Sequence, residues 1–435
     1  MKSAKISDVH GRRVWDSRGR PTVEVEVHCG TSTGRAIAPA GASTGSAEAV
    51  ELRDGGTAFG GRDVRRAVAN VDGTIAAALI GADVTDQRDV DARLVALDNS
   101  PTLASIGANA VVATSMACAH AAAAVNQMPL WQYLLGSSSG SGGGSSGGPT
   151  TMPLPEIQIF GGGAHAGRRI DIQDLMVMSP GASSFAEALD WTAEIYAAAG
   201  TLVDRSGVAD EGGWWPAFDT NEQAIETVVR AIELAGFKPG VDVVVSLDVA
   251  ASELWHEGHY RLGLEGRDLT SEEMCAMVVR WTTNYPIASV EDPLGEDDLD
   301  GLRAFTAAVG DRVQVVGDDV YVTNAARVAE LTGVANALLV KPNQAGTLSR
   351  AAAALAASRA ANCGAIVSAR SGESEDVTIV HLAVGWQVAQ LKVGSITRGE
   401  RTAKWNEALR IEDLLGADAR FAGWAPLPST TGGHR

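Results

Sequence analysis

The residues with the clearest chemical potential are charged side chains that end short apolar runs. Lys341 follows the run Ala337–Val340, and lysine is scarce, because arginine supplies most of the 35 basic residues. Arginine stays protonated, whereas a buried lysine can release its proton and act as a base. A strand-end lysine that merely reaches solvent is the alternative. Lys341 is therefore a candidate general base.

Similar runs recur through the second half of the chain, and each ends in a charge. The charged residues that end the other runs are Asp248, Glu291, Asp318, Arg370 and Lys392. Helical patterns such as Ala325–Leu331 and Leu348–Asn362 lie between the runs, so repeated strand–helix units predict a parallel α/β barrel. Because the strand ends of such a barrel share one mouth, these charged side chains are expected to converge there.

The three acids at these strand ends predict a magnesium site. Asp248, Glu291 and Asp318 offer hard oxygen ligands, and the alternative is that they cap their strands. The four cysteines are widely spaced and form no CxxC pair, which predicts reduced thiols and no zinc site. The net charge of −18 argues against nucleic acid and membrane partners, and bound cations would let an anionic substrate approach.

A flexible Gly/Ser linker, Ser137–Gly148, divides the chain. Residues 1–136 are predicted to form a small α+β capping domain, and residues 149–435 the barrel domain. In the first domain the predicted strands are Thr22–His28 and Arg35–Ala38, and the predicted helices are Ala47–Leu52, Val64–Ile80, Val90–Leu97 and Ile106–Val125. We find no apolar run as long as a membrane span and no signal-peptide pattern, which predicts a cytoplasmic protein.

Three glycine-rich loops carry further candidates. Ser43 lies in GASTG, Glu211 in DEGG and His165 in GGGAHA. Each loop taken alone also has an ordinary explanation: GASTG can be a simple turn, DEGG a solvated acidic turn, and GGGAHA a flexible loop with a surface histidine. The functional interpretation is that glycine allows tight loops that hold these side chains against a substrate.

Together, these motifs closely resemble the enolase (phosphopyruvate hydratase) family. DSRGRPTVEVEV, GASTG, DEGG, SLDVAASE, SVEDPL, VGDDVYVTN, VKPNQAGTLS, RSGESED and LKVGS follow one another in family order along essentially the whole chain. The resemblance implies an N-terminal α+β domain on an αβ barrel, a homodimer, two Mg²⁺ ions per active site and a small phospho- or phosphono-carboxylate substrate. Members of the superfamily remove a proton next to a carboxylate and stabilise the resulting ene-diolate with Mg²⁺.

The resemblance also implies a role for each site residue. Asp248, Glu291 and Asp318 correspond to the ligands of one Mg²⁺, Ser43 to a flap residue at a second Mg²⁺, Lys341 to the base, Lys392 to the cation on the substrate carboxylate, Arg370 and Ser371 to phosphate contacts, Gln173 to a neighbour of the carboxylate, Glu211 to the acid at the C3 hydroxyl, and His165 to a histidine on a closing loop.

Several positions depart from the family pattern. Ala369 stands where the family motif HRSGE has histidine, and Asp174 stands where IQEF has glutamate. Arg168 and Arg169 add charge to the loop of His165, and Trp214-Trp215 follow DEGG where Phe-Ala is usual. Groups for proton abstraction are kept, whereas groups around the departing hydroxyl are changed.

These departures favour a diverged enolase that resembles the carboxyphosphonoenolpyruvate synthases of phosphinothricin-type antibiotic pathways. Arg168, Arg169 and the tryptophans would then hold a second, nucleotide-activated substrate. One alternative is an ordinary enolase that converts 2-phosphoglycerate into phosphoenolpyruvate and water. Another is a non-catalytic binding protein on the same scaffold, which the retained acids and lysines disfavour.

Overall fold

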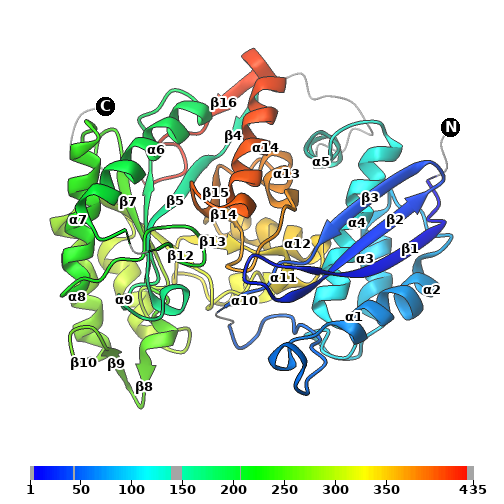
Figure 1. The fold of residues 1–435 in the computed structure, drawn as a ribbon, viewed down its shortest axis with the longest axis horizontal. Helices are drawn as coiled ribbons and strands as arrows, with labels where there is room; N and C mark the ends of the chain where they lie inside the picture. The colour runs from blue at the N-terminus through cyan, green and yellow to red at the C-terminus, as the bar shows by residue number, and fades with distance from the viewer. Residues whose placement is uncertain (1–3, 43–44, 139–148, 206, 429–435) are drawn as a thin grey trace.

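The computed structural model describes residues 4–42, 45–138, 149–205 and 207–428 of the 435-residue chain. Figure 1 shows two parts packed side by side, a small sheet with helices built by the N-terminal residues and a barrel surrounded by helices. The predicted barrel with an N-terminal α+β part is therefore confirmed.

The N-terminal sheet is antiparallel and packs on one long helix. Its strands are β1 (Asp8–Trp15), β2 (Pro21–Cys29) and β3 (Ser32–Ile37), in that order, and the helix is α4 (Ala108–Val125). The alternating valines Val23, Val25 and Val27 are fully buried. A Cβ atom on Gly34 would lie 2.1 Å from the backbone nitrogen of Ala121, so only glycine allows this approach of sheet and helix.

Further helices complete the N-terminal part. They are η1 (Ala58–Gly61), α1 (Arg65–Asn70), η2 (Val71–Ile75), α2 (Ala76–Leu79), α3 (Gln87–Ala96) and α5 (Leu130–Ser138). The predicted helix at Ala47–Leu52 is wrong. Its backbone donors bond to distant segments instead: Val50 N donates to Thr102 O at 2.7 Å, and Leu52 N donates to Asn109 Oδ1 at 3.1 Å. Because these donors are already used, no helical ladder forms there.

Eight strands close the barrel in the order β11-β12-β13-β14-β15-β5-β6-β7. They are β5 (Leu154–Gly161), β6 (Asp174–Met178), β7 (Val244–Asp248), β11 (Ile287–Glu291), β12 (Gln314–Gly317), β13 (Ala337–Val340), β14 (Gly364–Ser368) and β15 (Gln390–Ser395). The six strands expected from the charged runs are confirmed, whereas sequence patterns gave no sign of β5 and β6.

The prediction of a fully parallel barrel needs one correction. Strand β6 runs antiparallel to both β5 and β7, while the other neighbouring pairs are parallel. A parallel pair requires a long crossover, usually a helix. The link from β5 to β6 contains only the single turn η3 (Gly163–Ala166), so the chain returns directly and β6 points the opposite way.

Outer helices and short strands surround the barrel. They are α6 (Phe185–Leu202), α7 (Asn221–Leu234), η4 (Ala251–Leu254), α8 (Ser271–Asn284), α9 (Leu299–Val309), α10 (Ala325–Glu330), α11 (Pro342–Ala345), α12 (Leu348–Ala360), α13 (Thr378–Gly385), α14 (Gly399–Leu415), η5 (Gly416–Asp418), β4 (Thr150–Met152), β8 (Trp255–His256), β9 (His259–Leu262), β10 (Arg267–Leu269) and β16 (Ala419–Phe421). The two helices expected at 325–331 and 348–362 are α10 and α12.

Helix α4 meets the length and hydropathy expected of a membrane span, contrary to the expectation that no such segment exists. However, 83% of this 18-residue helix is buried inside the protein. Its alanines and valines pack against β2, β3 and neighbouring helices. The helix therefore belongs to the protein core.

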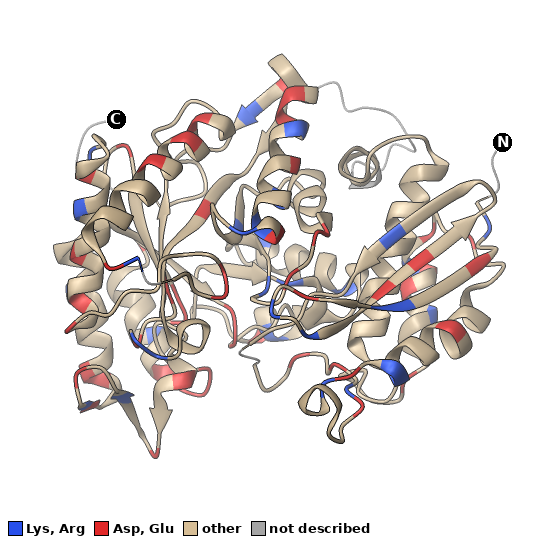
Figure 2. Ribbon diagram, viewed as in Figure 1, with Lys and Arg blue, Asp and Glu red and all other residues tan. Residues whose placement is uncertain are grey.

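Acidic residues are spread over the molecule. Figure 2 shows them on outer helices such as α6 and α14 as well as on the N-terminal sheet. The formal charge of −18 is thus not gathered in one patch.

Candidate active site

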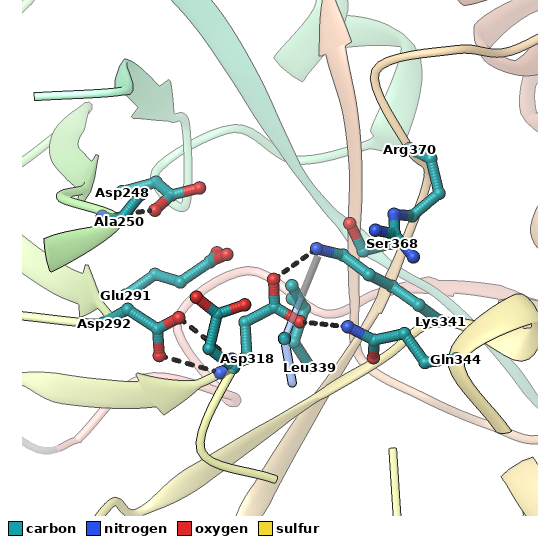
Figure 3. Close-up of polar contacts among 12 residues, drawn as sticks. Asp248, Ala250, Glu291, Asp292, Asp318, Leu339, Lys341, Gln344, Ser368 and Arg370 are labelled. Carbon is teal, nitrogen blue, oxygen red and sulfur yellow. Dashed lines mark hydrogen bonds and ion pairs between the residues drawn. The ribbon is translucent and has the colours of Figure 1, made fainter. Parts of the chain in front are cut away.

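Three carboxylates end neighbouring strands at one mouth of the barrel. Asp248 ends β7, Glu291 ends β11, and Asp318 follows β12 directly. All three side chains are buried, and Figure 3 shows them gathered around a common space. Glu291 Oε1 has no hydrogen-bond partner among the described residues. Buried oxygen ligands of this kind, one of them unsatisfied, fit a hard divalent cation.

Asp292 fixes the position of the third acid. Its carboxylate accepts hydrogen bonds from the backbone nitrogens of Asp318 and Asp319, at 2.9 and 3.0 Å. Gln344 Nε2 donates to Asp318 Oδ1 at 2.8 Å. Asp318 is therefore held from its backbone and from its side chain, as a pre-organised ligand requires. Asp292 and Gln344 were not predicted as site residues. Their positions in the sequence, directly after Glu291 and three residues after Lys341, could have indicated them.

Two lysines reach the same space from β13 and β15, two other strands of the barrel. Lys341 follows β13 and donates to Asp318, whereas Lys392 in β15 donates to Glu291 Oε2 at 2.7 Å and to Asp248 Oδ2 at 2.9 Å. Burial lowers the pKa of each lysine, but the facing carboxylates outweigh burial and raise it above the ordinary value. Lys341 can lose its proton readily only when the charge of Asp318 is compensated.

A cavity opens beside these charges. It is lined by Ala42, His165, Gln173, Asp174, Glu211, Asp248, Lys341, Ser368, Ala369, Arg370, Ser371, Lys392 and Val393. Nearly all predicted site residues thus meet in one place, and Glu291 and Asp318 join them through the lysine contacts. Ser43 lies outside the described residues.

Two carboxyl groups in one part of the cavity, Asp174 and Glu211, have pKa values shifted in opposite directions. His165 Nδ1 lies 3.4 Å from Asp174 Oδ1, and Gln158 also donates to Asp174. Burial opposes ionisation of Asp174, but His165, Lys392 and Gln158 lower its pKa to about 2. Burial and the nearby Asp174 charge raise the pKa of Glu211. Asp174 is therefore an anion, whereas the shift of Glu211 is in the direction that a general acid requires.

The N-terminal part of the chain and helix α14 hold Arg370 and Ser371 in place. Arg370 Nη1 donates to Glu48 Oε2 at 2.9 Å, and Arg18 Nη1 donates to Ser371 Oγ at 3.2 Å. Arg401 donates to the backbone oxygens of Arg370 and Ser371, at 2.7 and 2.6 Å. Arg18, Glu48 and Arg401 were missed, because nothing in the sequence shows that such distant segments meet at the barrel mouth.

Comparisons with known proteins agree with this geometry. Residues 6–134 match the family described as Enolase, N-terminal domain, and residues 149–427 match Enolase, C-terminal TIM barrel domain. The chain belongs to the enolase family. It is 44% identical over 436 residues to "Enolase" of Tropheryma whipplei (strain Twist), covering 98% of this chain and 99% of the relative. It is also 44% identical over 431 residues to "Enolase 1" of Desulfitobacterium hafniense (strain Y51), covering 97% and 96%.

Two departures from the enolase pattern lie inside the cavity. Ala369 lines it with a methyl group, and its backbone nitrogen donates to Lys392 O at 2.9 Å. Asp174 faces His165 and lies with Oδ2 3.8 Å from Lys392 Nζ. At position 369 the cavity therefore lacks a polar side chain, and Asp174 is engaged with other site residues.

The other departures lie outside the cavity. Arg168 pairs with Glu253 at 2.5 Å, and the Arg169 guanidinium lies 4.1 Å from the ring centroid of Trp215. Trp214 stacks on Tyr196 with ring centroids 4.7 Å apart. None of these side chains lines the described cavity, so their predicted contact with a second substrate stays a prediction.

Proposed function

We propose that the protein converts 2-phosphoglycerate into phosphoenolpyruvate and water, the reaction of an ordinary enolase. The observation that carries the proposal is the meeting of two lysines with three strand-end carboxylates at one barrel mouth. The relatives named as enolases, which match nearly the whole chain, support this reaction over the diverged one. Retention of every described charged group also disfavours a non-catalytic scaffold.

Magnesium is the proposed cofactor, with two ions per site. Asp248, Glu291 and Asp318 would hold one ion, and Ser43 belongs to the proposed second site. Bound Mg²⁺ supplies positive charge that stabilises the extra negative charge on the substrate carboxylate after proton loss. The unsatisfied Glu291 Oε1 and the purely oxygen ligand set fit this ion.

The remaining residues divide the work by position. Lys341 removes the proton next to the carboxylate, and Lys392 orients that carboxylate from β15, with Gln173 beside it. Arg370 and Ser371 would bind the phosphate, because both face the cavity on the loop after β14. Glu211 and His165 lie together at the other side of the cavity, where a protonated Glu211 can donate to the departing hydroxyl.

The direct test follows phosphoenolpyruvate by its ultraviolet absorbance. Purified protein is incubated with 2-phosphoglycerate and Mg²⁺, and the control contains excess chelator. We expect turnover in the range of ordinary enzymes, about 1–10³ per second, and none with chelator. Full activity in chelator would contradict the metal assignment, and absence of turnover would contradict the ordinary reaction.

A diverged reaction is the second candidate, and Ala369 and Asp174 are the observations that favour it. The ordinary reaction has to expel a hydroxyl, and one fewer acid–base group typically costs roughly 10²–10⁴-fold in rate. Under this candidate, which resembles carboxyphosphonoenolpyruvate synthesis, exchange of the α-proton in D₂O persists while dehydration is weak. Comparing both rates in one preparation separates the two candidates.

Three broader features remain proposals. The protein would act as a homodimer in the cytoplasm, without nucleic acid or membrane partners. Its domains would be residues 1–136 and 149–435, joined by the linker 137–148. Size-exclusion chromatography with light scattering tests the dimer, and a mass of one chain would contradict it.

A further inference from the structure

The loop that carries His165 is closed at its base by backbone hydrogen bonds. Its two ends are joined where Gly162 N donates to Gln173 O at 2.8 Å and Gly163 N donates to Ile170 O at 2.9 Å. At the far end the chain turns through Arg168, which has the left-handed φ of 57°. His165 is buried beneath this loop and faces the cavity. Any movement of the loop therefore moves the imidazole relative to a bound substrate.

A second loop holds this one through two backbone carbonyls. Asp210 N donates to His165 O at 3.1 Å, and the Trp215 indole Nε1 donates to Ala166 O. Glu211 lies in the same second loop, between the two donors. The two hydrogen bonds therefore fix the backbone that carries His165 relative to the backbone that carries Glu211.

Arg169 covers the indole from outside. Its guanidinium lies 4.1 Å from the ring centroid, within cation–π range, and Arg169 Nη1 donates to Trp215 O at 3.2 Å. The nearby ion pair of Arg168 and Glu253 is exposed, with 53% of the arginine side chain accessible, and such a pair contributes little. Trp215 therefore contacts the His165 loop twice, at Ala166 through its indole N–H and at Arg169 through its ring and its backbone oxygen.

We infer that Trp215 is a positioning residue that holds His165 beside Glu211 at the part of the site where the hydroxyl leaves. The inference rests on the proposed function, because it assigns the Trp215 contacts to that step. It also gives Arg169 a role that needs no second substrate: Arg169 holds the indole in place. Trp215 itself touches no reacting atom, since it does not line the cavity.

Limited proteolysis measures the loop directly. Arg168 and Arg169 are trypsin sites within the loop, and cleavage there follows the population of the opened loop when opening is fast. Trp215→Phe keeps an aromatic ring but removes the N–H donor. Loss of one such hydrogen bond predicts cleavage after Arg168 and Arg169 that is roughly 3- to 10-fold faster, identified by mass spectrometry. Trp424→Phe, at an exposed tryptophan beyond β16, is the matched control and should leave the rate unchanged.

Two reactions of the same variant distinguish positioning from general loss of structure. Trp215→Phe should lower kcat for dehydration roughly 10- to 100-fold, because a small displacement of catalytic groups is costly. Exchange of the α-proton in D₂O depends on Lys341, on another strand, and should change less than 2-fold. Glu253→Gln should change either rate less than 2-fold, because its ion pair is exposed.

Unchanged loop cleavage and unchanged kcat in Trp215→Phe would overturn the inference, as would an equal loss of both reactions. If Trp215→Phe does not fold, Arg169→Gln takes its place, because Arg169 is exposed and its replacement disturbs no buried packing. Cleavage after Arg168 should then be faster, and an unchanged rate would overturn the inference. Proteolysis needs no substrate, so a wild-type protein that fails to dehydrate 2-phosphoglycerate contradicts the proposed function without affecting this measurement.

Discussion

At the scale of single residues, each of the two lysines in the site is paired with strand-end acids. Lys341 contacts Asp318, and Lys392 contacts Asp248 and Glu291. The sequence was sufficient to find these five residues, because scarce lysines and strand-end acids stand out against an arginine-rich chain. It was insufficient for Glu48 and Arg18, whose contacts with Arg370 and Ser371 depend on how two distant parts pack.

Lys341→Arg is predicted to abolish exchange of the α-proton in D₂O. Arginine keeps the positive charge beside Asp318 but does not release its proton, so loss of the general base should cost roughly 10²–10⁴-fold. Nuclear magnetic resonance of 2-phosphoglycerate in D₂O measures the exchange. Lys238→Arg, at an exposed lysine, is the control. Exchange at the native rate in Lys341→Arg would show that another group is the base.

The altered positions in the cavity give a second prediction at this scale. Ala369→His together with Asp174→Glu distinguishes the two candidate reactions, because the pair restores a polar side chain at 369 and lengthens the carboxylate. The diverged candidate predicts a gain on the order of 10²-fold or more, whereas an ordinary enolase gains little. The phosphoenolpyruvate assay measures both proteins side by side. A loss of activity in the double variant would contradict the diverged candidate.

At the scale of elements, strand ends were predictable and strand direction was not. Apolar runs that end in charge identified β7, β11 and the four strands that follow, whereas β5 and β6 lack such an ending within their apolar runs. Gln173 and Asp174 precede and begin β6, so their inward position follows from its antiparallel direction. The extended segment 47–52 was misread as a helix because its backbone partners lie far away in the chain.

Helices α4 and α13 meet through a pair of histidines, one buried and one partly buried, that predicts acid sensitivity. His120 and His381 have ring centroids 5.8 Å apart. Burial lowers the pKa of both, that of His381 to about 4, although Asp376 raises both and Glu407 also raises that of His120. The unfolded chain therefore binds more protons below about pH 6.5, and stability falls as the pH drops from there toward 4.

The test compares unfolding by urea at pH 7 and pH 5. His381→Gln should reduce the loss of stability between these pH values by about 2 kcal/mol relative to wild type. The figure follows because pH 5 lies about 1.5 units below the pKa of an unfolded histidine, and each unit contributes about 1.36 kcal/mol. His256→Gln, at an exposed histidine, should behave as wild type. An identical loss in His381→Gln and wild type would show that other groups control the acid response.

At the scale of the whole molecule, the site collects negative charge in a chain that already carries a net −18. Mg²⁺ is therefore predicted to raise the melting temperature. A ligand that binds only the folded state at 100 times its Kd stabilises it by about 2.7 kcal/mol. Asp318→Asn should lose most of this shift, whereas Asp300→Asn, at a fully exposed side chain, should keep it. A wild-type melting temperature that is the same with and without Mg²⁺ would contradict the metal site.

The barrel is closed by β5 and β15, which pair from Gln390↔Leu154 to Ser395↔Gln158. During translation β5 leaves the ribosome more than two hundred residues before its partner. Until β15 is made, one edge of β5 has no neighbour, and an unpaired strand edge invites pairing with other chains. Lys392 lies in that closing strand. The newly synthesised chain therefore acquires a complete barrel and the second lysine of the site in the same late event.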